Sequence, residues 1–405
     1  MKILFTMILM VSLSAHSLLL SAQGVENSMP ETSVDTQETD EAISLSGSID
    51  SYFHKSFGTV EEAPRTSFSN LPGFSLGMVN LIGSYRGKKS GFVADLVVGP
   101  RGSDAVFNAP LHKNVSGSGS AHFINQMYAY YQISKKVKLN FGQFNTFLGY
   151  ELIAPKNFHY STSYLFSYGP FNHTGLWADL DLKKGWTSKV AIMNPTDYTE
   201  YNPFDSYTVG WQIGYTQPGH SGYLNMTYGD PDGKLQSSDS VGSVSMGNTL
   251  QFDFTASFNI THVFNISLNS SYRTVSPGEI MTAASREKSS RPNQGFYGMA
   301  VYQKVLFTDH FNMGLRTEYF SEFHGGVGAI GGYNSLGRSA VVGITLSANI
   351  ISDNLRFIPE LRLDKTTSDT FTREADSVAI SHMFSFNFAV VYSVPTLEHN
   401  IRRKK

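Results

Sequence analysis

The sequence predicts an all-β fold, a transmembrane antiparallel β-barrel of about 16 strands. Between residues 249 and 273, apolar residues occupy every second position and small polar residues fill most of the positions between them. The same period of two recurs along the chain, and the segments that carry it are joined alternately by short turns and long loops. In an outer-membrane barrel, the apolar face of such a strand contacts lipid and the polar face contacts a water-filled lumen.

The N-terminal residues predict export from the cytoplasm. Lys2 precedes an apolar run from Ile3 to Leu20, and the small residues Ser21 and Ala22 follow it, as at a signal-peptide cleavage site. We therefore divide the chain into a signal peptide (1–22), a flexible acidic periplasmic leader (23–41), the transmembrane β-barrel (42–392) and a basic periplasmic tail (393–405).

Each strand is predicted from its alternating pattern and from the turn residues at its ends. In chain order, we expect strands at 42–54, 75–86, 91–99, 122–133, 136–144, 173–182, 186–193, 207–217, 221–229, 249–260, 263–273, 296–306, 310–320, 339–350, 354–364 and 379–392.

The connections predict how the barrel lies in the membrane. Short turns are expected at 86–89, 134–135, 183–185, 218–220, 261–262, 308–309 and 352–353, and every other connection is a long loop. Because outer-membrane barrels have short periplasmic turns and long outer loops, both termini are expected on the periplasmic side. An even number of strands then closes the sheet without free edges. A soluble β-sandwich is a weaker interpretation, since its connections seldom alternate so strictly.

Aromatic residues are sorted to the strand ends, as in the two interfacial girdles of a membrane barrel. Those expected near the outer ends are Tyr207, Tyr228, Tyr272, Tyr297 and Tyr319, and those near the periplasmic ends are Tyr215, Phe264, Phe311 and Tyr392.

The composition agrees with an exported barrel and excludes other classes. Charged residues make up 16% of the chain, and there is no cysteine. A disulfide scaffold is therefore excluded, and a closed ladder of strand hydrogen bonds must stabilise the fold. Residues 42–392 carry equal numbers of basic and acidic residues, so the barrel lacks the positive surface that a nucleic-acid partner requires.

The third long loop, 145–172, is long and unusually apolar. A floppy loop displaying this many apolar side chains to water would be unfavourable, so we expect it to fold inward. Its apolar residues are Phe147, Leu148, Leu152, Ile153, Phe158, Leu165, Phe166 and Phe171.

Two motifs at the ends of this loop are specific. They are FGQFNTFLGYE from Phe141 to Glu151 and YGPFNHTG from Tyr168 to Gly175. With them, the chain from about residue 42 to 392 resembles the β-barrel porin-2 (OmpL-like) family of outer-membrane proteins. The resemblance implies a porin-like channel and says little about its substrate. The basic tail departs from the usual terminal aromatic residue of such barrels.

By analogy with sixteen-stranded porins, a loop after the fifth strand constricts the pore. Glu151 and Lys156 carry the formal charges of loop 145–172 and are the predicted constriction residues. The alternative is that Glu151 only caps or pairs within the loop. The predicted pore wall comprises Asp179, Asp181, Asp253, Arg273, Arg316, Glu318, Arg356, Glu360 and Arg362.

The inward charges on strands eleven to fifteen are mixed but rich in arginine, whereas strands one, three, six and ten carry Asp50, Asp95, Asp179, Asp181 and Asp253. Facing charges of opposite sign would create a transverse field that orients polar solutes. The alternative is local neutralisation, because Arg316 lies beside Glu318 and Glu360 beside Arg362 on the same strand faces.

Three classes of function are considered. The leading one is a passive porin for small hydrophilic solutes. A plugged barrel that acts in surface binding or adhesion is the alternative. An outer-membrane lipid hydrolase is less favoured, because His382 faces lipid near the outer end of the last strand but no serine can be assigned to it.

We predict no enzymatic activity, catalytic residue, cofactor or metal. The expected partners are outer-membrane lipid, small hydrophilic solutes and the barrel-assembly machinery of a Gram-negative bacterium. No nucleic acid is expected, and homo-oligomerisation is left open.

Overall fold

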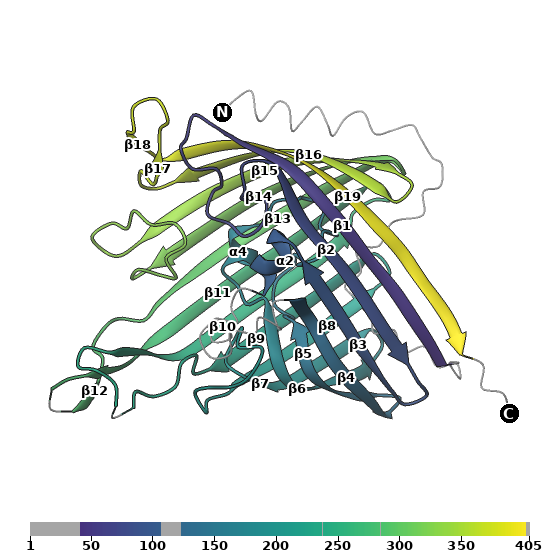
Figure 1. Cartoon of the computed structure of the whole chain (residues 1–405), viewed down its shortest axis with the longest axis horizontal. Coiled ribbons are helices and arrows are strands. Elements are labelled where there is room, and N and C mark those ends of the chain that lie inside the picture. Colours follow the sequence, from purple (N-terminus) through teal and green to yellow (C-terminus); the bar gives the residue numbers. More distant parts are fainter. Residues whose placement is uncertain (1–40, 107–122, 237, 284, 402–405) are drawn as a thin grey trace. The chain divides into compact units, whose positions relative to one another are not determined.

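The computed structural model describes residues 41–106, 123–236, 238–283 and 285–401. The predicted signal peptide and all of the acidic leader except Glu41 lie outside these residues. The described chain from Glu41 onward forms a closed antiparallel barrel of 16 long strands. Figure 1 shows these strands running side by side and tilted.

The first nine barrel strands are β1 (Glu41–Phe57), β2 (Gly73–Arg86), β3 (Ser90–Val98), β4 (Ile124–Ser134), β5 (Val137–Asn145), β6 (Asn172–Lys183), β7 (Trp186–Met193), β8 (Thr208–Gln217) and β9 (His220–Gly229). The others are β10 (Val244–Asn259), β11 (Phe264–Met281), β13 (Gln294–Thr308), β14 (Phe311–Phe323), β15 (Ser339–Ser352), β16 (Leu355–Thr366) and β19 (His382–Ile401). Short elements in the loops are α2 (Pro100–Ala105), α4 (Tyr164–Ser167), β12 (Arg286–Lys288), β17 (Phe371–Thr372) and β18 (Ala379–Ile380).

Each barrel strand pairs with its neighbours in sequence, and the first and last strands close the ring. β1 pairs with β19 from Glu41 opposite Ile401 to Phe57 opposite Phe384. Ala42 also lies opposite Arg86 at the end of β2. The two ends of the barrel chain therefore lie at the end that carries the short turns, as the connection lengths predict.

The predicted facing of the strands is confirmed by the exposure pattern. Phe254 and Leu346 are exposed on the outer face, whereas the adjacent Thr255 and Thr345 are buried on the inner face. The outer-end tyrosines of the predicted girdle are exposed as well. This alternation is the reverse of that in a soluble protein, because the solvent around the barrel is lipid.

The largest extensions beyond the predicted strand ends are those of β11 and β19. β11 continues to Met281 and pairs with the short β12. β19 continues beyond residue 392 to Ile401 and pairs with the start of β1. Pro395, which has no N–H to donate, lies within β19 at a bulge, where β19 has one residue more than β1 between the pairs Leu45–Leu397 and Gly47–Val394.

The buried apolar residues lie on the inner side of the barrel, where loop segments pack against the strands. One such cluster joins Tyr164 and Leu165 of α4 to Phe296 and Phe320 of the wall. Of the helices in the described ranges, none is long and apolar enough to cross a membrane.

Candidate functional site: the inner face of the barrel

Segment 145–172 contacts the inward-facing side chains of several strands. Glu318 of β14 accepts hydrogen bonds from the backbone N–H groups of Tyr164 (2.9 Å) and Leu165 (2.8 Å). Asp253 of β10 accepts one from the N–H of Gly149 at 2.8 Å. Buried carboxylates of the wall thus bind backbone amides of the loop, which satisfies both partners away from water.

Glu360 of β16 and Asp50 of β1 repeat this arrangement around Tyr160. The N–H groups of Tyr160 and Ser161 donate to Glu360 at 2.8 and 3.1 Å. The Tyr160 hydroxyl donates to Asp50 at 2.5 Å. The segment is therefore held by carboxylates on β10, β14, β16 and β1.

Arg316 and Glu151 form a buried ion pair between wall and loop. Arg316 Nη1 lies 2.6 Å from Glu151 Oε1, and the side chains are 1% and 3% exposed. Arg316 also donates to the carbonyl of Ser161 at 2.7 Å. The other oxygen of Glu151 accepts from the N–H and the hydroxyl of Ser163, the N-cap of α4.

Arg362 forms the second buried pair of the wall, with Asp364 on the same strand. The guanidinium donates through Nε at 2.8 Å and Nη2 at 3.0 Å, a bidentate contact. It also donates to the carbonyl of Thr162 at 2.6 Å. Both arginines thus bind loop carbonyls in addition to a carboxylate.

Apolar packing fixes the loop along most of its length. Each of the four buried clusters contains residues of 145–172: Tyr164 and Leu165 in the first, Ile153, Phe166 and Phe171 in the second, Phe147 and Leu148 in the third, and Tyr160 in the fourth. Burial of this many apolar side chains supplies a driving force for keeping the segment against the wall.

Sequence reasoning missed the parts of the site that come from the first two outer loops. Arg101 of α2 is buried, donates to the carbonyl of Ile153 at 3.1 Å and lies over the ring of Phe68, 4.4 Å from its centroid. Phe68 belongs to loop 58–72, and the hydroxyl of Ser167 accepts from the N–H of Ser67 at 2.9 Å. The signals in the sequence that could have indicated this contact are Phe68 and the prolines Pro64 and Pro72 of loop 58–72.

The other predicted site residues lie apart from this packed region or at its edge. Lys156 is exposed, and Arg356 is half-buried and donates to the carbonyl of Pro155. Arg273 lies near the middle of β11, half-buried beside a small cavity. Asp181 accepts from the N–H of Lys183 close to a periplasmic turn. Neither the transverse field nor a constriction by Glu151 and Lys156 follows from these contacts, and both stay predictions.

A charged cluster on β5, β6 and β7 keeps contact with solvent on the inner face. Lys138, Asp179 and Lys189 lie opposite one another in register. Asp179 is 3.5 Å from the ammonium of Lys138 and 2.5 Å from that of Lys189, and the three side chains are 20%, 21% and 18% exposed in that chain order. The side of β5–β7 is therefore a solvent-exposed part of the inner face.

His159 is a titratable group buried under the loop. Its Nδ1 lies 2.8 Å from the hydroxyl of Ser347. Burial, followed by the nearby cations Arg316, Lys304 and Arg362, holds the pKa of His159 well below its usual value. The imidazole is therefore neutral at physiological pH.

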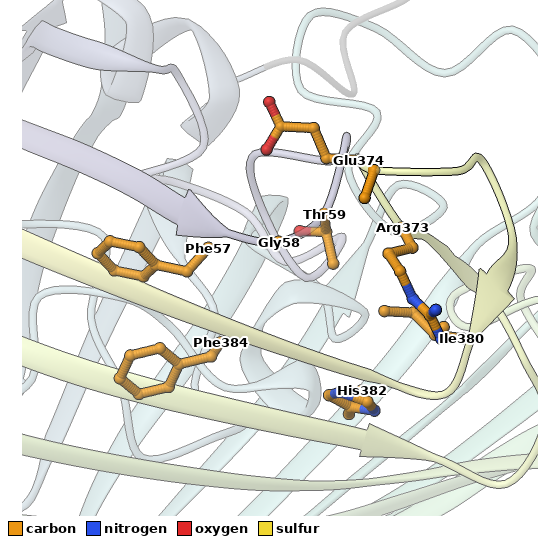
Figure 2. Close-up of a pocket in the computed structure, with 9 residues that line it drawn as sticks. Phe57, Gly58, Thr59, Arg373, Glu374, Ile380, His382 and Phe384 are labelled. Atoms are coloured by element: carbon orange, nitrogen blue, oxygen red, sulfur yellow. The ribbon is translucent and has the colours of Figure 1, made fainter.

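Apart from the inner face, the structure has an open groove of about 530 Å³ on the outer side of the barrel, near the outer ends of β1 and β19 (Figure 2). Phe57 and Phe384 lie side by side along it, and His382 lies near Ile380. The residues that line it are Phe57, Gly58, Thr59, Arg373, Glu374, Ala375, Ile380, His382 and Phe384. No serine is among them, so the described residues of the groove do not supply the nucleophile that a serine hydrolase would need.

The inner face also offers no metal centre within the described ranges: no group of three histidine, cysteine or carboxylate side chains lies close enough there to hold an ion. The carboxylates instead bind amides and cationic side chains. With its lipid-facing outer surface and polar inner face, the chain is a β-barrel of the bacterial outer membrane, of the porin type.

The chain belongs to the family described as "Putative beta-barrel porin-2, OmpL-like", whose model matches residues 42–393. The resemblance seen in the sequence is thereby confirmed. No curated protein matches the chain.

Solved outer-membrane proteins share the fold at low sequence identity. A loop L8 deletion mutant of OmpT from Vibrio cholerae gives a TM-score of 0.54 at 11% identity, covering 88% of this chain and 100% of that one. The outer membrane channel DcaP of Acinetobacter baumannii gives 0.53 at 12%, with 87% and 97% covered. An anion-selective porin from Comamonas acidovorans gives 0.51 at 9%, with 87% and 98% covered. At these identities the likeness concerns the fold.

Proposed function

We propose that this protein is a passive channel for small hydrophilic solutes and that segment 145–172 narrows its passage. The observation that carries the proposal is the division of the inner face. On the side of β13–β16 and β1, the wall is buried against the segment, with Arg316, Glu318 and Glu360 each about 1% exposed. On the side of β5–β7, charged side chains keep contact with solvent. A solute would therefore pass along the second side.

The family and the named neighbours support transport rather than catalysis. The chain belongs to a porin family, and two of the solved neighbours are named as a channel and a porin. We further propose that residues 1–22 direct export and are removed, and that the barrel-assembly machinery inserts the chain. One neighbour is titled as a trimer form, and association of this chain with further copies of itself is part of the proposal.

The test of the channel is conductance of the purified, folded protein in planar bilayers. We expect stepwise current increases as single barrels insert. A folded protein that inserts but carries no current would overturn the channel and favour the plugged barrel, whose function would lie in its outer loops.

The narrowing by segment 145–172 is tested with two glutamates that share one strand face. Glu318 binds amides of this segment, whereas the buried Glu322 accepts from Val327, Ala329 and Ile330 of the outer loop 324–338. Glu318→Gln weakens hydrogen bonds to a charged acceptor, which are typically worth about 1.5–3 kcal/mol each. We expect higher and more variable single-channel conductance from this variant.

Glu322→Gln is the comparison, because it weakens a comparable set of bonds to loop 324–338, whose Ala329 and Ile330 only pack against Tyr164 and Leu165 of the segment. We expect it to raise the conductance less than Glu318→Gln does. Equal conductance in the parent and in both folded variants would place segment 145–172 outside the narrowest part of the channel.

A further inference from the structure

The cluster of Lys138, Asp179 and Lys189 has the composition of an anion site. Two ammonium groups lie on either side of one carboxylate, so the three side chains carry a net positive charge. Asp179 is further held by Asn140, whose Nδ2 donates to it at 3.0 Å. The carboxylate is therefore occupied on both oxygens, whereas each lysine has three donors and uses at least one.

Aromatic rings hold the two lysines in place. The ammonium of Lys189 lies 5.4 Å from the ring centroid of Trp177, and that of Lys138 lies 5.5 Å from that of Tyr130. Trp177 is itself buried against the neighbouring residues of the wall. A cation over an aromatic face is attracted to it, so the lysines are positioned rather than free to fold back onto other groups.

The acidic side chains of the inner wall are, by contrast, mostly withdrawn from solvent. Asp50, Asp95 and Asp253 are each less than a tenth exposed and bind side-chain amides, backbone amides or a tyrosine hydroxyl. Glu318 and Glu360 are buried under segment 145–172. Asp181 is half-buried two residues further along β6, beside the periplasmic turn, where it accepts from the N–H of Lys183. A solute that enters from the outer end would therefore meet the ammonium groups of the cluster before it met Asp181.

We propose that Lys138 and Lys189 form a binding step for small anions, including organic solutes that carry a carboxylate. The solute's negative group accepts from N–H donors of the two ammonium groups that Asp179 does not use. The charge of Asp179 partly offsets the attraction, which prevents retention that is too tight for passage. This inference rests on the proposed channel and names the class of solute that the channel favours. The exposed Lys156 of the loop adds positive charge to the inner surface without belonging to the cluster.

The experiment measures the reversal potential of the conducting protein across a bilayer with a gradient of potassium chloride. The parent is expected to favour chloride over potassium, more strongly in dilute salt because screening is weaker there. The double variant Lys138→Gln with Lys189→Gln should lower the permeability ratio of chloride to potassium toward unity or below. Asp179→Asn should raise this ratio. Lys288→Gln is the control, because this exposed lysine lies on β12, outside the 16 barrel strands.

A second readout is inhibition of the chloride current by added acetate or succinate, which should weaken in the double lysine variant and persist in the Lys288 control. A channel that conducts but favours potassium, or whose selectivity and inhibition are the same in the double variant as in the parent, would overturn the anion site and leave the channel standing. Absence of any current would instead overturn the channel. A general folding defect does not depend on whether a positive or a negative charge is removed. Opposite shifts of the permeability ratio in the lysine and aspartate variants would therefore exclude such a defect.

Discussion

Replacement of Glu151 by glutamine should release segment 145–172 while the barrel stays folded. Arg316 would lose its carboxylate partner at 2.6 Å while its side chain remains 1% exposed. Removing one partner of a buried ion pair typically costs about 3–5 kcal/mol, because the remaining charge is left without compensation. The cost applies to the packing of the loop, since the strand ladders on both sides of β14 contain no contact with Glu151.

This loss of free energy can be measured as an increase in the fraction of molecules in which segment 145–172 is released from the wall. At about 1.4 kcal/mol for each factor of ten, the loss corresponds to an increase of about 100-fold to 4,000-fold in the population of the released loop. Lys156 lies in the middle of the segment and is exposed, so trypsin can cleave after it once the backbone is free to enter the protease. The assay is the rate of cleavage at Lys156 in detergent-folded protein, under conditions where opening is faster than cleavage.

Two comparisons make this prediction specific. Arg373 and Asp376 form a pair at 3.2 Å whose side chains are 47% and 45% exposed. Asp376→Asn should therefore change cleavage at Lys156 very little, since exposed pairs contribute about 0–1 kcal/mol. The double variant Glu151→Leu with Arg316→Met should recover much of the protection, because it removes both charges together. If Glu151→Gln is cleaved at the same rate as Asp376→Asn, the ion pair does not hold the loop.

Two further predictions concern the lipid face and pH. Val190→Arg on the lipid-facing side of β7 should lower barrel stability by about 2–4 kcal/mol, as measured by reversible unfolding in micelles. Gln212→Arg, on the inner face of β8 opposite Lys189, should lower it by much less, and equal losses would contradict the assigned facing. Because the pKa of His159 is held below its usual value, the unfolded loop binds protons more readily, so loop packing should weaken as pH falls below about 6.5. Cleavage at Lys156 should therefore accelerate between pH 7 and 5 in the parent and less so in His159→Asn, and identical pH profiles would exclude this group.

The barrel could be predicted because its determinants are local. Each strand pairs with the next one in sequence, so alternation, turn residues and loop lengths are enough to give the order of the strands. The facing of Phe254 and Thr255 follows directly from a period of two. The errors fell at strand ends, where β19 continues past Pro395 with a bulge beside Gly47 and pairing with β12 extends β11.

The site could be predicted only in part because its contacts are not local. Glu318 and the N–H of Tyr164 are 154 residues apart in the sequence, and no periodicity relates them. The apolar content of segment 145–172 indicated that it avoids water, and the charges of the wall indicated a polar inner face. Which carboxylate binds which amide depends on the path of the loop across the wall, and that path also depends on Arg101 and Phe68 from other loops.

Because these contacts depend on the path of the loop, a chain with equal numbers of acidic and basic residues can expose unequal numbers of them on its inner face. Residues 42–392 contain as many acids as bases, so their count predicts no preference between anions and cations. Folding buries both signs under segment 145–172, because Glu318 and Glu360 accept from its N–H groups and Arg316 and Arg362 donate to its carbonyls. Lys138 and Lys189 lie outside this packed region and keep contact with solvent beside one carboxylate. The proposed selectivity of the channel therefore depends on how the loop is anchored, because the anchoring decides which charges of the inner face remain in contact with solvent.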